Sequence, residues 1–220
     1  MAEDERLTGD QVTAQLTTEG PTDWRPVLRR VVTRFKTGDF VTGLQFVTKV
    51  AEAAEAANHH PDVDLRYPHV DITLMSHDVG STTQRDIRLA REISEIAAGM
   101  GISADPGPCA ILEVALDTWD ADEIWPFWAA LLGAEGDANE VKDPAGRLPA
   151  LWFQDAERHD ERRQRFHFDV WVPTDVAQSR IDAALAAGGT LVSDEHAPSY
   201  VVLADAQGNR ACICTSASRG

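Results

Sequence analysis

Apolar and polar residues alternate with two different periods in the first hundred residues. Residues 40–57 and 81–97 carry apolar side chains at spacings of three and four, which predicts two amphipathic helices. Residues 70–74 alternate between apolar and polar, as in a strand with one buried face, and residues 63–65 and 27–35 also favour strands. With a short N-terminal helix, the predicted order is helix, strand, helix, two strands, helix. This order predicts an α+β fold with helices on one face of an antiparallel sheet.

The sequence also indicates where the two long helices begin and end. The first helix is expected to bury a stripe that includes Phe40 and Leu44. It should end near Asn58, because Pro61 drives the residue before it out of the helical region. The second helix is expected to begin at Ser81, a residue type that caps helix N-termini.

The second half of the chain repeats one pattern: a strand, a helix that ends in glycine, and then further strands. The predicted elements cover residues 111–116, 120–133, 148–153, 166–172, 181–189, 190–193, 200–203 and 210–214. A charged segment of both signs, residues 155–165, is predicted to be a solvated loop. An internal repeat of this size is a signal at the level of the fold.

Residues 103–108 have the composition of a linker. This segment contains two prolines and a glycine, and the periodic pattern before it has ended. We therefore predict two domains, residues 1–104 and residues 105–220.

Composition limits the classes of partner and compartment. The chain has 220 residues, with 36 acidic against 20 basic residues and a formal charge of −16. This charge disfavours nucleic acid, whose phosphates would be repelled. No apolar run approaches the roughly 18 residues of a membrane helix, and the acidic N-terminus is not a secretion signal. We expect a cytoplasmic protein without membrane contact, and the three cysteines are expected to be reduced.

Four of the seven histidines, His59, His60, His69 and His77, fall between residues 55 and 86, and His69 is expected to be a surface residue of the predicted strand. His59 and His60 are adjacent, His77 follows the predicted strand, and Asp86 lies early in the next helix. Imidazole exchanges protons near neutral pH, so this set suits acid/base catalysis. The residues alone leave open two other interpretations, exposed surface histidines and a three-histidine zinc site. Adjacent histidines, however, usually diverge too far to share one metal.

One family pattern runs through the first half of the chain, from about residue 7 to residue 96. The matching residues are Trp24, Arg34-Phe35, Asp39-Phe40, Phe46-Val47, Val50-Ala51-Glu52, Glu55, Asn58-His59-His60-Pro61-Asp62, Tyr67, Val70, Thr73, Ser76-His77-Asp78 and Thr83-Gln84-Arg85-Asp86. This set resembles the pterin-4a-carbinolamine dehydratases. Pro68 and the pair Gly80-Ser81 depart from the family pattern, at positions without a catalytic role. The resemblance implies a domain of the αββαββα type.

The resemblance also implies a reaction, the dehydration of 4a-hydroxytetrahydropterin to quinonoid dihydropterin and water. Water leaves from C4a while N5 loses a proton, and no metal or organic cofactor is required. We expect His59 and His77 to perform the acid/base work and His60 to position or polarise the hydroxyl. Asp86 and Glu55 are expected to orient the imidazoles by hydrogen bonds. Which histidine is the acid and which the base is left open.

Three further residues, Asn58, Pro61 and Ser76, are expected to bind or orient the substrate by the same resemblance. The expected partners are a small pterin and further copies of the chain, as a dimer or tetramer formed through sheet edges or the long helix. The alternative is a non-enzymatic protein that uses both domains for recognition or dimerisation. A complete set of His59, His60, His77 and Asp86 favours the enzyme.

The second half is similar to the glyoxalase/bleomycin-resistance superfamily, the vicinal oxygen chelate proteins. The matching pieces are 127–133, 167–170, 185–189, 203–205 and 208–209. The resemblance implies two βαβββ modules that form a cupped sheet around a pocket of unknown ligand. Metal-using members carry ligands at positions here occupied by Glu113, His167 and Cys212, with Gln154 as a fourth candidate. Because an intact set of histidines and glutamates is missing, we predict no metal, with Glu113 and His167 as the residues to examine.

Overall fold

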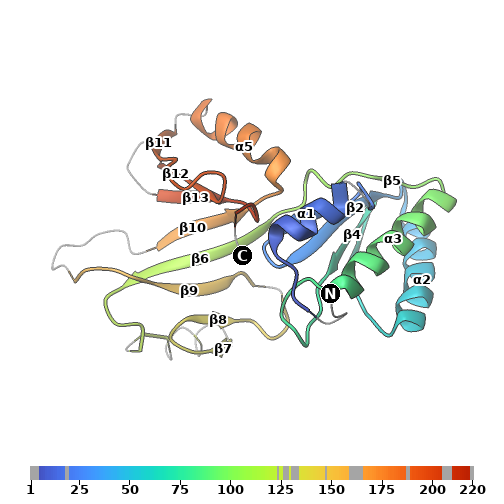
Figure 1. Cartoon of the computed structure of the whole chain (residues 1–220), viewed down its shortest axis with the longest axis horizontal. Coiled ribbons are helices and arrows are strands. Elements are labelled where there is room, and N and C mark those ends of the chain that lie inside the picture. Colours follow the sequence, from blue (N-terminus) through green and yellow to red (C-terminus); the bar gives the residue numbers. More distant parts are fainter. Residues whose placement is uncertain are drawn as a thin grey trace. The chain divides into compact units, whose positions relative to one another are not determined.

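The computed structural model describes residues 5–17, 20–122, 124–125, 129, 134–146, 148–158, 166–186, 189–204 and 210–218. The chain forms two compact units, Met1–Cys109 with Ser216–Gly220, and Ala110–Thr215 (Figure 1). Each unit has apolar cores of its own. None of the described helices is long and apolar enough to cross a membrane. All three cysteines are free, as predicted.

The first unit has the αββαββα order that the family resemblance implies. Its elements are α1 (Gly9–Thr17), β1 (Arg25–Val27), β2 (Arg30–Lys36), α2 (Phe40–Ala57), β3 (Asp62–Arg66), β4 (His69–Leu74), α3 (Gln84–Gly99) and β5 (Ser103–Ala104). The antiparallel sheet has the order β1-β2-β4-β3, and β5 pairs with β2. Figure 1 shows α2 and α3 lying side by side. The α+β class is confirmed.

Two predicted segments of this unit differ from the structure. The single strand predicted over residues 27–35 is a hairpin of β1 and β2, because the chain turns at Leu28, which has a positive φ of 58°. The prediction of a linker over residues 103–108 is wrong for its first two residues. Ser103 and Ala104 pair with Lys36 and Phe35 of β2 and so extend the sheet. Composition alone did not show that this short segment completes a sheet edge.

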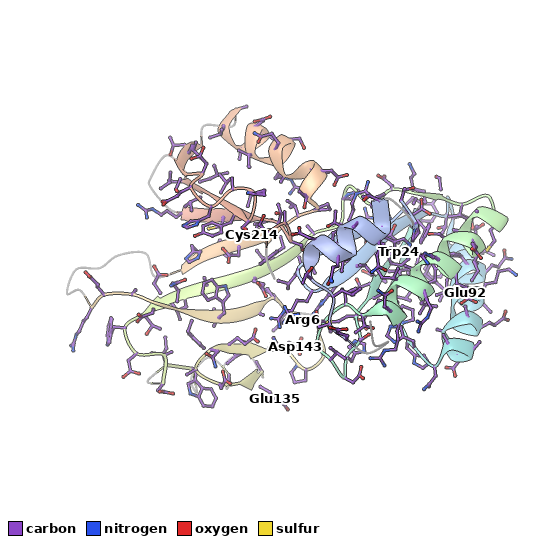
Figure 2. All side chains as sticks on the ribbon, in the orientation of Figure 1. Arg6, Trp24, Glu92, Glu135, Asp143 and Cys214 are labelled. Atoms are coloured by element: carbon purple, nitrogen blue, oxygen red, sulfur yellow. The ribbon has the colours of Figure 1, made fainter. Side chains whose placement is uncertain are left out.

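Aromatic side chains fill the core of the first unit. Phe35 contacts Phe46 edge to face at 5.0 Å between ring centroids, and Trp24 contacts Phe35 at 6.2 Å. The Trp24 indole donates its N–H to the Ser94 hydroxyl at 3.0 Å, so its polar atom is satisfied. Trp24 is buried in this unit, whereas Glu92 on α3 is exposed; both are labelled in Figure 2. These contacts connect α2 and α3 to the sheet that supports the site described below.

The helix α2 buries a different side from the one predicted. Its buried residues are Gly43, Phe46, Val50, Ala53 and Ala54. Phe40 and Leu44, predicted to face the core, are 50% and 53% exposed. The helix carries apolar residues on two sides, so the hydrophobic period alone could not decide which side packs on the sheet.

The helix α3 begins two residues later than predicted. Its N-cap is Thr83, whose hydroxyl accepts the Arg85 N–H at 3.2 Å, and not Ser81. Ser81 instead forms an isolated bridge with Ser76. The third residue of the helix, Asp86, accepts the backbone N–H of Thr83 at 2.7 Å and so completes a capping box. This arrangement fixes Asp86 at the start of α3, where the candidate site lies.

The second unit contains the two predicted modules in one sheet. Its elements are β6 (Ile111–Thr118), β7 (Glu135–Gly136), β8 (Glu140–Lys142), β9 (Ala150–Asp155), β10 (Phe166–Trp171), α5 (Thr174–Ala186), β11 (Thr190–Ser193), β12 (Tyr200–Ala204) and β13 (Arg210–Cys214). The strand order is β11-β12-β13-β10-β6-β9-β8-β7. The predicted strands are confirmed. The patterns missed β7 and β8, which are too short to show a period.

Parts of the second unit lie outside the described residues. The helix predicted over residues 120–133 is helical at 121–122, 124–125 and 129. Asp120 has no regular structure, and residues 123, 126–128 and 130–133 are not described. Residues 159–165 of the predicted charged loop, Gly188 and residues 207–209 also lie outside the described residues. Residues 156–158 at the start of the loop have no regular structure.

Candidate active site

The end of α2 determines how the two adjacent histidines are placed. Asn58 caps the helix in the left-handed conformation, with φ 48° and ψ 41°, and its N–H donates to the carbonyls of Ala54 and Glu55. The His59 N–H donates to the Ala54 carbonyl at 3.1 Å. Because the chain reverses here, His59 is buried whereas His60 is exposed. Asn58 and Pro61 therefore shape the backbone that carries the histidines.

The buried partner of His59 is Asp86. The His59 Nε2 lies 2.7 Å from Oδ1 of Asp86, and Asp86 is fully buried. A carboxylate carries no proton at its oxygens, so Nε2 is the donor and Nδ1 is the ring atom that can exchange a proton with a ligand. The short, charge-assisted contact holds the imidazole in one orientation.

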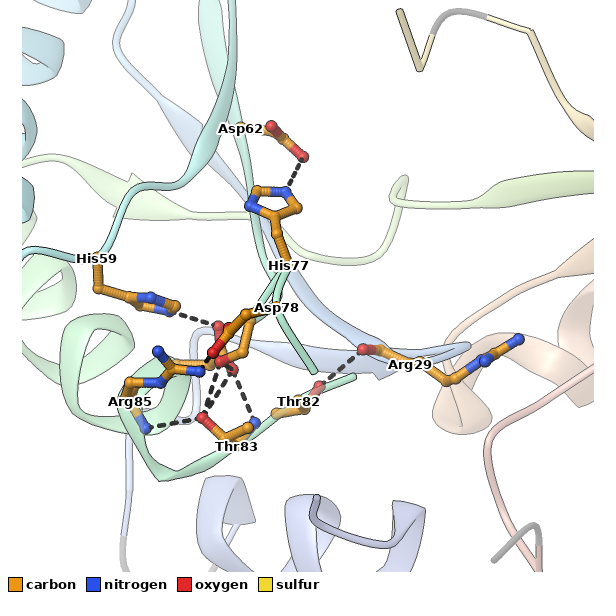
Figure 3. Close-up of polar contacts among 10 residues, drawn as sticks. Arg29, His59, Asp62, His77, Asp78, Thr82, Thr83 and Arg85 are labelled. Carbon is orange, nitrogen blue, oxygen red and sulfur yellow. Dashed lines mark hydrogen bonds and ion pairs between the residues drawn. The ribbon is translucent and has the colours of Figure 1, made fainter. Parts of the chain in front are cut away.

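The second oxygen of Asp86 is held by donors from two directions. Oδ2 accepts the Ser76 hydroxyl at 2.8 Å and the Thr83 backbone N–H at 2.7 Å. The hydroxyls of Ser76 and Thr83 are also 2.8 Å apart, and both residues are fully buried. Burying a carboxylate is costly unless hydrogen bonds replace its lost hydration, and these donors supply them. Figure 3 shows how the contacts connect the end of β4 to the start of α3.

The other two histidines have exposed carboxylate partners. Nε2 of His60 lies 3.2 Å from Oε1 of Glu55, one turn back along α2. Nε2 of His77 lies 3.8 Å from Oδ2 of Asp62, and Figure 3 shows its ring turned toward Asp62. Exposed pairs of this kind are weak, so both rings are free to reorient. They are oriented less firmly than His59.

A salt bridge closes the loop that carries His77. The Arg85 guanidinium donates to Oδ1 of Asp78 at 2.7 Å. This hydrogen bond from Arg85 lowers the pKa of Asp78 below its ordinary value. The contact joins the residue after His77 to the first turn of α3. It therefore links the loop that contains His77 to the helix that contains Asp86.

The structure places the predicted site residues in three groups. His59, Ser76 and Asp86 form one connected network, His60 contacts Glu55, and His77 contacts Asp62. We expect the imidazoles of His59, His60 and His77 to converge on one hollow that holds the substrate, and this stays a prediction. Sequence reasoning missed the position of Asp62, although a carboxylate directly after His-His-Pro, at the start of the strand that pairs with β4, was a usable signal. It also missed Thr83, which contributes both backbone and hydroxyl.

The candidates of the second unit lie on neighbouring strands. His167 is in β10, where its ring lies between Asp117 and Asp169. Glu113 is in β6, directly opposite Asp169, and Gln154 is in β9, opposite Asp117. Cys212 in β13 is opposite Asp169 on its other side.

Comparisons with known proteins match each unit to a different family. Residues 5–96 match the family described as pterin 4 alpha carbinolamine dehydratase, and residues 113–214 match the glyoxalase-like domain. A Picosynechococcus protein named "Putative pterin-4-alpha-carbinolamine dehydratase" is 40% identical over 91 residues, which are 41% of this chain and 97% of that protein. A protein of the same name from Mycobacterium sp. (strain JLS) is 45% identical over 93 residues, 41% of this chain and 94% of that protein.

One solved structure also matches. It is described as a transcriptional coactivator/pterin dehydratase from Brucella melitensis and is 33% identical in sequence, with a TM-score of 0.39. The match covers 42% of this chain and 99% of that chain.

Proposed function

The chain belongs to the pterin-4a-carbinolamine dehydratase family through its first unit, and we propose that this unit dehydrates 4a-hydroxytetrahydropterin to quinonoid dihydropterin and water. The second unit is a glyoxalase-like domain. The observation that carries the proposal is the buried pair of His59 and Asp86, with 2.7 Å between Nε2 and Oδ1. A histidine held in this way by a buried carboxylate is suited to moving a proton.

The reaction requires two proton transfers. The hydroxyl on C4a leaves as water after it receives a proton, and N5 gives up a proton as the C4a–N5 double bond forms. His59 takes up or releases a proton at Nδ1, and Asp86, which is bound at Nε2, stabilises the imidazolium ring of the protonated state. His77 is the second acid/base group, and its exposure lets it exchange protons with solvent. The assignment of acid and base between them is left open.

His60 positions the substrate hydroxyl in this mechanism. Its exposed ring and its weak contact with Glu55 let it turn toward a ligand. Asn58 and Pro61 fix the backbone between α2 and β3, and Ser76 acts through Asp86. Both transfers move protons only, so the reaction draws on no cofactor.

Turnover of the carbinolamine by the full chain tests the proposal. His59→Ala and His77→Ala should each lower kcat by about 100-fold or more, the usual contribution of a general acid or base. His69→Ala is the matched control, since His69 lies in β4 of the same unit and has no role in the mechanism. Full rates in both His59→Ala and His77→Ala, after subtraction of spontaneous dehydration, would exclude the assignment of these two residues. A natural chain that adds nothing to the spontaneous rate would favour the non-enzymatic alternative.

We also propose that the first unit self-associates through the exposed side of α2. Phe40, Val41 and Leu44 lie on this side, and all three are at least half exposed. Monomeric proteins rarely leave several large apolar side chains together in water. A second copy of the same helix would cover them with matching apolar side chains.

A further inference from the structure

The sheet of the second unit has two unlike faces. Successive residues of a strand point to opposite faces, and residues paired in register share a face. One face packs on α5 through Val170, Val201, Leu203 and Ile213, which form a core with Ile181. The residues whose register places them on the opposite face include Glu113, Asp117, Trp152, Gln154, His167, Asp169 and Cys212. Ionisable side chains are thus concentrated on the face away from α5.

Three of these side chains form a compact cluster. His167 and Asp169 are two residues apart on β10 and therefore project to the same side. Cys212 pairs with Asp169 in the parallel register of β10 and β13. One ligand atom from each of the three residues lies within 4.8 Å of the others, and His167 Nε2 is 3.7 Å from Asp169 Oδ1. Among the described residues, Glu113 is not part of this cluster.

The His167 ring has a second carboxylate, that of Asp117, near the nitrogen that does not face Asp169. Nδ1 of His167 lies 3.5 Å from Oδ1 of Asp117, on the side away from Asp169. Trp152 packs edge to face against the ring, with 5.9 Å between ring centroids. A carboxylate on one ring nitrogen fixes the tautomer and leaves the other nitrogen as a ligand, an arrangement common behind metal-binding histidines.

The burial of the cluster favours a bound cation. Asp169 and Cys212 are buried, whereas His167 is partly open. Burying the Asp169 carboxylate costs free energy, and the positive charge of a divalent cation would lower this cost. The further carboxylates of Glu113 and Asp117 on the same face make the local field negative.

We propose that His167, Asp169 and Cys212 together bind one thiophilic divalent cation, with zinc as the best fit. Thiolate, imidazole and carboxylate are the three zinc ligand types, and thiolate disfavours magnesium, calcium and manganese. Three protein ligands leave a fourth position for water or a ligand oxygen. Tetrahedral zinc places its ligand atoms about 3.5 Å apart, and the ligand atoms of this cluster already lie within 4.8 Å of one another. The sequence predicted no metal because an intact set of histidine and glutamate ligands is missing, and Asp169 was not considered as a ligand.

Metal loading of the full chain tests this site without reference to any activity. The chain is stripped with a chelator, loaded with zinc or cobalt(II), dialysed, and measured by elemental analysis and absorption. One zinc per chain is expected, and cobalt(II) should show the near-ultraviolet charge-transfer band of a thiolate ligand together with tetrahedral visible bands. Substoichiometric zinc, or cobalt(II) without the thiolate band, would overturn the proposal.

Single substitutions then test which side chains bind the metal ion. Cys212→Ser should abolish the cobalt–thiolate band, and Asp117→Asn, behind His167, should weaken zinc binding about 10- to 100-fold. Cys214→Ser is the matched control, because Cys214 is a buried cysteine two residues along the same strand and outside the cluster. A band that survives in Cys212→Ser contradicts the proposal.

X-ray absorption of the zinc-loaded natural chain gives a test that does not depend on a variant folding. One sulfur neighbour at about 2.3 Å, with nitrogen and oxygen neighbours at about 2.0 to 2.1 Å, is the expected shell. A shell without sulfur excludes Cys212 as a ligand.

Discussion

Two adjacent histidines, His59 and His60, have opposite surroundings. His59 is buried against the carboxylate of Asp86, whereas His60 lies in solvent near Glu55. The left-handed residue Asn58 produces this difference, because it reverses the chain directly before them. His59 is therefore held in one orientation, which suits the proposed proton transfer, whereas the exposed ring of His60 is free to move. The histidine pair was evident from the sequence. Its division into a buried and an exposed member depends on a backbone conformation that the residue types do not specify.

Ser76 tests how firmly Asp86 is held. Ser76→Ala removes the hydroxyl that donates to Oδ2 of Asp86 at 2.8 Å. Removing one partner of a buried charged group costs about 1–3 kcal/mol, so the free energy of unfolding in urea should fall by that amount and kcat should fall with it. Ser81→Ala, which removes another buried serine hydroxyl of the same segment, is the control. Equal losses in the two variants would show that the contact with Asp86 is not the cause.

The ends of two helices of the first unit position the candidate site residues: His59 follows the C-terminus of α2, and Asp86 lies in the first turn of α3. The order of elements was predictable because Val70, Ile72 and Leu74 alternate cleanly and all three are buried. The buried side of α2 was not predictable, because Phe40 and Leu44 continue the apolar pattern on the side that faces solvent. The cap of α3 was placed at Ser81 because serine suits that position. Thr83 takes it because Asp86 closes the capping box from inside the helix.

The N-cap of α2, Asp39, should make the free energy of unfolding depend on pH in the acidic range. Asp39 accepts the backbone N–H of Thr42 at 2.8 Å and its hydroxyl at 2.9 Å, and these bonds lower the pKa of Asp39 below its ordinary value of 3.8. A depressed pKa in the folded state means that the contribution is present above the unfolded pKa and is lost as pH falls through the folded pKa. The natural chain should therefore exceed Asp39→Asn in urea midpoint at pH 7 by more than at pH 3. The same difference at both pH values would contradict this view of the cap.

At the scale of the whole molecule, the chain joins two units with separate cores and separate candidate sites. The proposed dehydration uses groups between residues 55 and 86 of the first unit, whereas the proposed cation site uses β10 and β13 of the second. The sequence indicated both families from short motifs. It did not indicate the cluster of His167, Asp169 and Cys212, because that cluster depends on the register between two strands about 40 residues apart.

Self-association through α2 is also a property of the whole molecule. Leu44→Glu places a charge among the exposed apolar residues of the helix and should shift the chain to a smaller species in sedimentation velocity. Lys49→Glu, exposed on another side of α2, should leave the sedimentation coefficient unchanged. An unchanged coefficient in Leu44→Glu, or a natural chain that sediments as a monomer, would contradict association through this side.

The central claim is that Asp86 serves the reaction by holding His59, and a double-mutant cycle on kcat/KM for carbinolamine dehydration tests it most directly. Asp86→Asn alone should lower kcat/KM by about 100-fold, but should change it less than about 2-fold when His59 is already alanine, because two residues that act as one unit are not additive. Circular dichroism of all three variants checks that each is folded. If Asp86→Asn lowers kcat/KM by the same factor with and without His59, Asp86 acts independently of the imidazole and the claim fails.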